Sequence, residues 1–152
     1  MWLALFQRFA GDAAGAKVTT AEAARNTFEQ LYKDQSRNFV ANDGPCLSLA
    51  YAVMGEKDAA LKEAQHLIVR YPSTKDAVNG AALEENLALI QTILGENSLA
   101  TSTLAHVLQM PGSTYIYSTA SITPALLRLD PLWDPLRSDP AFQKLCCEEK
   151  QP

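Results

Sequence analysis

The feature that most constrains this chain is an internal similarity between two stretches that lie 40 residues apart. Residues 47–72, LSLAYAVMGEKDAALKEAQHLIVRYP, align with residues 87–112, LALIQTILGENSLATSTLAHVLQMPG, when Gly55 is placed on Gly95. Both stretches contain a Gly-Glu pair, an alanine five residues after the glycine and a leucine eight residues before it. Self-similarity of this kind is typical of folds that stack one supersecondary unit on the next.

A weaker third copy lies at the start of the chain, where Gly11-Asp12 takes the place of the Gly-Glu pair and Leu3 and Ala16 stand at the matching offsets. In each copy an apolar helix can end at the glycine, because glycine adopts the left-handed conformation of a helix C-terminus at little cost. The acidic residue favours the N-terminus of the next helix, and the alanine allows close packing. Each copy is therefore predicted to be a helical hairpin that needs neighbours to bury its apolar face.

Helix-favouring residues dominate the rest of the chain, and no turn signal lies between two alternating runs, so we predict an all-α fold. Apolar and small residues at helical spacing predict one long helix at about 20–38. The Asn79-Gly80 pair is interpreted as a helix stop followed by a restart, within a long connection at 73–86. Residues 112–123, GSTYIYSTASIT, are predicted to form a loop.

Three Asp-Pro pairs lie within residues 128–142, RLDPLWDPLRSDPAF. They could form a metal or catalytic cluster, but aspartate is a strong helix N-cap and proline suits the first helical position. No histidine stands at metal-ligand spacing from them. We therefore predict helix starts, with one short helix opened by Thr123-Pro124, one or two turns in DPLWDPLR and a final helix opened by Asp139. The apolar residues of this segment are expected to cover the last repeat as a cap: Leu126, Leu127, Leu129, Trp133, Leu136, Phe142 and Leu145.

The repeated pattern resembles the tetratricopeptide repeat. That family sets a leucine and a small residue before a tyrosine, then glycine, alanine and proline, which here are Leu47, Ser48, Tyr51, Gly55, Ala60 and Pro72. Gln91 replaces the tyrosine in the last copy, and the glycine spacings of 44 and 40 residues exceed the family's ~34. The resemblance implies antiparallel hairpins stacked as a right-handed superhelix in one domain, 1–152. Its expected parts are a degenerate repeat with the long helix at about 1–40, repeats at 41–72 and 80–112, and a C-terminal helical cap at 123–149.

Residues 75–111 followed by 121–145 also resemble the C-terminal end of bacterial regulators, which carry such repeats behind a winged-helix, Ser/Thr kinase or adenylate-cyclase module. No motif of those modules occurs in this chain, and the resemblance carries over no catalytic residue. It implies a non-enzymatic, cytoplasmic module that binds a protein or peptide, or the upstream domain of its own polypeptide. Met1 is then interpreted as a boundary within a longer protein, and a homodimer is a further possibility.

The concave groove of such an array is the expected binding site. Its lining would come from the first helix of each hairpin: Asn42, Leu49 and Val53 in the middle copy, and Glu85, Asn86, Leu89 and Ile93 in the last. A mixed polar and apolar lining suits an extended peptide or a helix. The alternative is that the long helix or the cap fills this groove. A second functional hypothesis is a sensor that binds a small molecule between the repeats and the cap.

Composition narrows the partners further. A net charge of −4 and a pI near 5.1 provide no positive field for nucleic-acid phosphates. The apolar runs are only a few residues long, so no membrane span is expected, and no residues suggest a cofactor or metal. The three cysteines are a poor disulfide framework. Cys46 is expected to be a small core residue, and Cys146-Cys147 a frayed tail.

Overall fold

The computed structural model describes residues 2–20, 43–110 and 122–147, and every regular element in these residues is a helix. The all-α prediction is thus confirmed for this part of the chain. The predicted long helix lies outside the described residues except for its first position, and so does nearly all of the predicted loop at 112–123. None of the described helices is long and apolar enough to cross a lipid bilayer. The chain divides into two compact units, Met1–Arg70 and Tyr71–Pro152.

The first unit contains two helical hairpins. Helix α1 (Trp2–Phe9) is followed by a turn and a second helical stretch at 13–20. Helix α3 (Asp43–Met54) is followed in the same way by α4 (Lys57–Arg70), which lies against it, and α1 also contacts α3. The core of this unit is aliphatic, with Leu5, Leu49, Val53 and Leu67 among its fully buried side chains.

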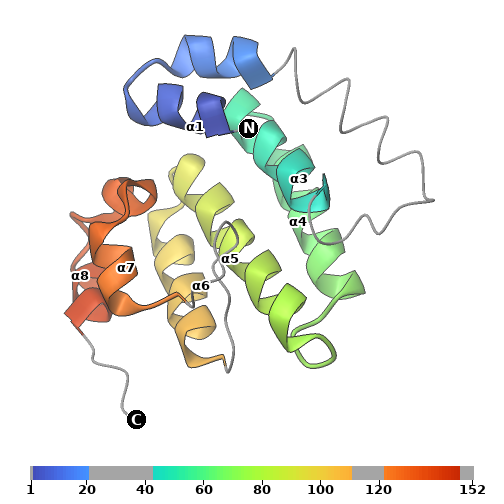
Figure 1. Cartoon of the computed structure of the whole chain (residues 1–152), viewed down its shortest axis with the longest axis vertical. Helices are drawn as coiled ribbons and strands as arrows, with labels where there is room; N and C mark the ends of the chain where they lie inside the picture. Colours follow the sequence, from blue (N-terminus) through green and yellow to red (C-terminus); the bar gives the residue numbers. More distant parts are fainter. Residues whose placement is uncertain (1, 21–42, 111–121, 148–152) are drawn as a thin grey trace. The chain divides into compact units, whose positions relative to one another are not determined.

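The second unit contains one hairpin and a C-terminal segment. Helices α5 (Ala77–Ile93) and α6 (Asn97–Gln109) lie side by side, and α7 (Pro124–Leu129), the 3-10 helix η1 (Pro131–Leu136) and α8 (Pro140–Cys147) follow (Figure 1). η1 contacts both α5 and α6, while α8 contacts α6 and α7. The aromatic side chains of Trp133 and Phe142 are fully buried in this unit.

The three glycine turns share one hydrogen-bond pattern. Gly11, Gly55 and Gly95 have φ values of 89°, 85° and 79°, in the left-handed region. Each glycine N–H donates to the carbonyl three residues back, at 3.0, 3.0 and 3.1 Å. The N–H of the acidic residue that follows donates to the carbonyl five residues back, at 2.8 Å in all three turns. These paired bonds define the Schellman motif, so the predicted helix ends at glycine are confirmed.

The second helix of each hairpin begins in the same way as well. The N–H of the alanine five residues after the glycine donates to the carbonyl of the acidic residue at 3.0 Å, and Ala16, Ala60 and Ala100 are all fully buried. A side chain of one methyl group lets the two helices approach closely at this point. The copy at Gly11, which has the lowest sequence similarity, therefore has the same local geometry as the other two.

A side-chain bond that the sequence did not reveal also recurs between the two helices of a hairpin. Thr19 Oγ1 donates to Gln7 Oε1 at 2.8 Å, and Thr103 Oγ1 donates to Gln91 Oε1 at 2.9 Å. In both hairpins the glutamine stands four residues before the glycine and the threonine eight residues after it. Gln91, which stands where the middle copy has Tyr51, therefore has a structural role that Gln7 repeats.

The interpretation of Asn79-Gly80 as a stop and restart is wrong, because α5 runs through both residues without a break. α5 begins at Ala77, and Asp76 is its N-cap. The Asp76 side chain accepts hydrogen bonds from the N–H of Asn79 at 3.0 Å and from the Asn79 side-chain amide at 2.7 Å. A Cβ atom on Gly80 would lie 2.4 Å from Cα of Ser73. Glycine at this position thus makes room for the backbone of the preceding turn.

The helix-start prediction is confirmed at two of the three Asp-Pro pairs. Asp130 accepts a hydrogen bond from the N–H of Leu132, and Asp139 from that of Ala141, each at 2.9 Å. Thr123 caps α7 in the same manner, by accepting from the N–H of Leu126 at 3.1 Å. The second pair, Asp134-Pro135, lies inside η1 and starts no helix.

The apolar residues predicted for the C-terminal cap differ in their exposure. Leu129 was expected among the packed residues, but 70% of its surface is exposed, so this prediction is wrong. The helical register explains the difference, because Leu127 occupies the buried face of the short helix α7. Leu126 is half-buried, and the other members of the predicted set are buried: Leu127, Trp133, Leu136, Phe142 and Leu145.

Candidate functional site

The residues predicted to line a binding groove are buried. Leu49 and Val53 lie in α3 and have no exposed surface, whereas Asn42 lies outside the described residues. The remaining four lie on α5 and are all at least nine-tenths buried: Glu85, Asn86, Leu89 and Ile93. Glu85 and Asn86 are neighbours, and the further steps of three and four residues to Leu89 and Ile93 keep all four on one side of that helix. They are packing positions in this structure, and binding through them stays a prediction.

The first hairpin exposes three large apolar side chains. Leu3 and Phe6 of α1 are 62% and 65% exposed, and Val18 in the helical stretch at 13–20 is exposed to a similar degree. Phe6 stands five residues before its glycine, the same offset as Ala50 and Ile90, which are both at least 98% buried. Leu3 and Phe6, three residues apart, lie on one face of α1. We call Leu3, Phe6 and Val18 the first-hairpin face.

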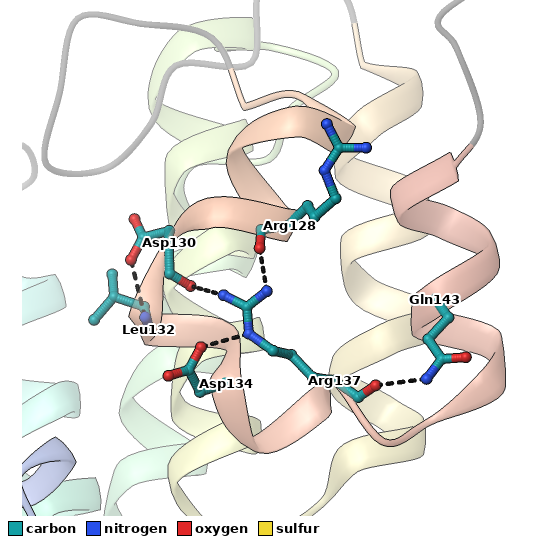
Figure 2. A network of polar contacts seen from close by, with 6 residues as sticks. All are labelled: Arg128, Asp130, Leu132, Asp134, Arg137 and Gln143. Atoms are coloured by element: carbon teal, nitrogen blue, oxygen red, sulfur yellow. Dashed lines mark hydrogen bonds and ion pairs between the residues drawn. The ribbon is translucent and has the colours of Figure 1, made fainter.

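Arg137 ties the C-terminal segment of the second unit together (Figure 2). Its Nε donates to Asp134 Oδ1 at 2.5 Å, and its two Nη atoms donate to the backbone carbonyls of Arg128 and Asp130. Its own carbonyl accepts from Gln143 Nε2 at 2.8 Å. The guanidinium thus satisfies carbonyls at the end of α7 and links α7 to η1, which uses most of its hydrogen-bonding capacity. The backbone carbonyl of Arg137 provides the link to α8.

A cleft of about 410 Å³ lies beside this arginine. The residues that line it come from α7, α8 and the turn before α8: Arg128, Arg137, Phe142, Gln143, Cys146 and Cys147. The guanidinium of Arg128 is directed away from the Arg137 network and makes no hydrogen bond or ion pair with any described residue (Figure 2). The cleft therefore contains one cation without a counter-charge among these residues.

The two cysteines of this cleft belong to α8, which contradicts their interpretation as a frayed tail. Cys146 is buried, Cys147 is exposed, and both thiols are free. Burial raises the pKa of the Cys146 thiol above its ordinary value, and the neighbouring Cys147 acts in the same direction. The charges of Arg137 and Arg128 pull the same pKa down, so the positive charge of both arginines reaches this sulfur. Cys46, expected to be a small core residue, is half-buried in α3.

A second cleft, of about 370 Å³, separates α6 from α8. Its lining is rich in hydroxyl groups and carries one residue of each charge: Ser98, Thr101, Ser102, Ala105, Asp139, Ala141, Lys144 and Leu145. Thr101 Oγ1 donates to Asp139 Oδ2 at 3.3 Å and so joins the two helices at one end. This cleft lies between the last hairpin and the C-terminal segment, where the sequence suggested a small-molecule site.

A serine, a glutamate and a histidine also meet on the α5–α6 hairpin. His106 Nδ1 lies 2.7 Å from Glu84 Oε2, and Ser73 Oγ donates to Glu84 Oε1 at 3.2 Å. The carboxylate stands between the other two groups, so the imidazole cannot take the proton of the serine as a nucleophilic triad requires. The described residues also bring together no three His, Cys, Asp or Glu side chains that could hold a metal ion.

The chain was compared with known protein families, curated proteins and solved structures. No protein-family model, no curated protein and no solved structure matches the chain. Any function must therefore be inferred from the hairpins, the first-hairpin face and the two clefts.

Proposed function

We propose that this chain is a non-enzymatic helical-repeat module of the tetratricopeptide type, which binds a helical segment of a partner protein or of its own upstream domain. The observation that carries this proposal is the glycine turn that recurs three times with the same hydrogen bonds and the same buried alanine. Units that repeat this closely are characteristic of stacked arrays, which use their extended surfaces to bind other proteins. A place at the C-terminal end of a bacterial signalling or transcriptional regulator is part of the proposal.

The first-hairpin face supports the idea of a helical partner. Ala50 and Ile90 are buried, while Phe6 at the same offset is 65% exposed. Exposed apolar side chains that gather on one helix face mark interaction sites more often than isolated ones do. A partner helix with apolar residues at a spacing of three to four would cover Leu3 and Phe6 as stacked hairpins cover each other.

The C-terminal segment fits the same proposal as a cap. A repeat array needs a terminal element that covers its last apolar face and presents polar residues to water. η1 and α8 contact the α5–α6 hairpin and contain the buried Trp133 and Phe142, and their outer positions carry Asp134, Gln143 and Lys144. We propose that this segment closes the array at α6.

Photo-crosslinking in cells that naturally contain the protein tests the proposal. A benzoylphenylalanine at position 6 should give one main product, whose crosslinked peptide has apolar residues at helical spacing. Leu3→Glu should weaken that product while leaving circular dichroism unchanged, because Leu3 is exposed. The matched control is position 62, an exposed lysine at the same offset from its glycine as Val18. Equal crosslinking at positions 6 and 62, or none at position 6, would contradict the proposal.

The cleft between α6 and α8 favours a second candidate function, a sensor for a small polar molecule. Its hydroxyl groups, Asp139 and Lys144 could orient such a ligand within a volume of about 370 Å³. Native mass spectrometry of protein purified from its natural source should then show a bound small molecule. Ser102→Trp should abolish binding, because the indole would fill the cleft from an exposed position. A mass equal to that of the chain alone would rule this candidate out.

A further inference from the structure

The cleft between α7 and α8 has a charge distribution that the proposed function does not use. Arg137 lines it, but this guanidinium is paired with Asp134 and bonded to two carbonyls. Arg128 lines it without a partner among the described residues, and none of the six lining residues is acidic. Among the described residues, the cleft is thus a concave surface whose positive charge has no acidic partner.

The rest of the lining limits what could bind there. Phe142 and the buried Cys146 thiol form an apolar wall, and the exposed Cys147 stands at its edge. Burial raises the pKa of the Cys146 thiol, and the charges of Arg137 and Arg128 act in the opposite direction. A guanidinium donates two parallel hydrogen bonds to a carboxylate, a geometry that a compact ammonium group does not offer. An apolar body attached to that carboxylate could contact the Phe142 side.

We propose that this cleft is a binding site for a carboxylate carried on a small apolar body. The guanidinium of Arg128 holds the carboxylate, and Phe142 and Cys146 contact the apolar part. Arg137 acts as a positioning residue, because it fixes the end of α7 from which Arg128 extends (Figure 2). This site differs from both the first-hairpin face and the α6–α8 cleft, so it can be tested independently of the proposed function.

Cys147 provides a built-in reporter for the charge in the cleft. Iodoacetate and iodoacetamide both alkylate a cysteine by attack of the thiolate sulfur on the CH2 carbon with loss of iodide, but only iodoacetate carries a carboxylate. Peptide mapping of Cys147 gives the rate constant for each reagent, and their ratio cancels any change that affects both alike. Arg128→Gln should lower the ratio of iodoacetate to iodoacetamide rates by about fivefold, and Arg128→Lys should preserve most of it.

Lys75→Gln is the matched control, since it removes an exposed cation of the same unit that does not line the cleft. Its ratio should equal that of the unaltered protein. Glu148 and Glu149 follow Cys147 in the sequence, but they are the same in every variant and cannot create a difference between them. A ratio that Arg128→Gln leaves unchanged, or that Lys75→Gln lowers equally, would overturn the proposal.

Reversible binding tests the rest of the proposal with a matched pair of probes. Phenylacetate should protect Cys147 from iodoacetamide in a saturable manner, whereas phenylacetamide, with a similar shape but no charge, should not. Protection should be lost in Arg128→Gln. A peptide that ends in phenylalanine with a free carboxylate carries the same chemistry, so comparing the two at equal concentration distinguishes a metabolite-like source from a chain terminus. Equal protection by phenylacetamide, or by inorganic phosphate, would show that the site does not select this ligand class.

Discussion

At the scale of single residues, Gly80 shows how the surroundings of a position can outweigh its intrinsic helix propensity. Glycine within a helix is less favourable than alanine by about 1 kcal/mol. For that reason the sequence predicts that a helix ends at Asn79-Gly80 and another begins after it. The structure places Gly80 inside α5 with the backbone of Ser73 against it. The missing side chain is a packing requirement of the turn before α5.

We therefore expect Gly80→Ala to destabilise the protein, although the same change at an open helical site stabilises it. A Cβ 2.4 Å from Cα of Ser73 must displace backbone, and the free energy of unfolding should fall by about 1–3 kcal/mol in urea titrations. Ser102→Ala, at an exposed position of α6, should leave it within experimental error. A gain in stability for Gly80→Ala would show that the backbone of Ser73 does not limit the space at this position.

Trp133 offers a second test at this scale. Its side chain is 1% exposed, and its indole N–H has no hydrogen-bond acceptor among the described residues. Trp133→Ala should lower the free energy of unfolding by about 3–5 kcal/mol through lost burial. Trp133→Phe should cost much less, because it keeps the aromatic packing and removes a buried donor that itself costs about 1–3 kcal/mol. Similar losses for both variants in urea titrations would mean that the N–H has an acceptor.

At the scale of elements, the C-terminal segment shows how very short helices persist. α7 and η1 have six residues each and α8 has eight, well below the length at which an isolated helix is stable. Each has its first N–H groups or last carbonyls satisfied by a side chain, from Thr123, Asp130, Asp139 or Arg137. Capping and packing against the α5–α6 hairpin together replace the stability that length would provide.

Asp139 combines both effects, so its substitution measures them together. Asp139→Ala removes the cap of α8 and the bond from Thr101, and we expect a loss of about 1–2 kcal/mol in thermal or urea unfolding. Asp139→Asn should retain most of this stability, because asparagine caps helices about as well as aspartate does. If both variants behave like the unaltered protein, the cap does not stabilise α8.

At the scale of the whole molecule, the same hairpin occurs in both compact units. The first unit contains the turns at Gly11 and Gly55, and the second contains the turn at Gly95. A protein built from such units can open in parts, since each unit has a core of its own. Stability is then a property of each unit as well as of the chain.

Amide hydrogen exchange in Gly95→Ala tests this view. A Cβ at Gly95 would meet no atom within 4 Å, so the cost of about 1–2 kcal/mol comes from the left-handed backbone alone. We expect faster exchange in α5 and α6 and little change in α3 and α4. Gly55→Ala should show the reverse, and equal acceleration in both units for either variant would mean that the chain opens only as one body.

Several parts of the fold and the candidate sites were predictable because their causes lie within a few residues. Glycine at 11, 55 and 95, with an acidic residue next to it, determines a helix end and a new start through bonds that span at most five residues. Thr123, Asp130 and Asp139 determine caps through bonds to the second or third residue that follows. The cation of Arg128 is visible in the sequence as well, but the sequence does not show that it has no partner among the described residues.

The sequence by itself determined that this chain forms helices, where many of them begin and end, and which hairpin recurs. Only the tertiary structure decided which side chains meet: Thr103 with Gln91, Ser73 with Gly80, and Arg137 with the carbonyls of α7. It also buried Glu85 and Asn86 and left most of the Phe6 side chain exposed. The physical reason is the sequence distance between the interacting residues. Caps and turns are determined by neighbours along the chain, whereas burial, exposed faces and clefts depend on how whole helices pack.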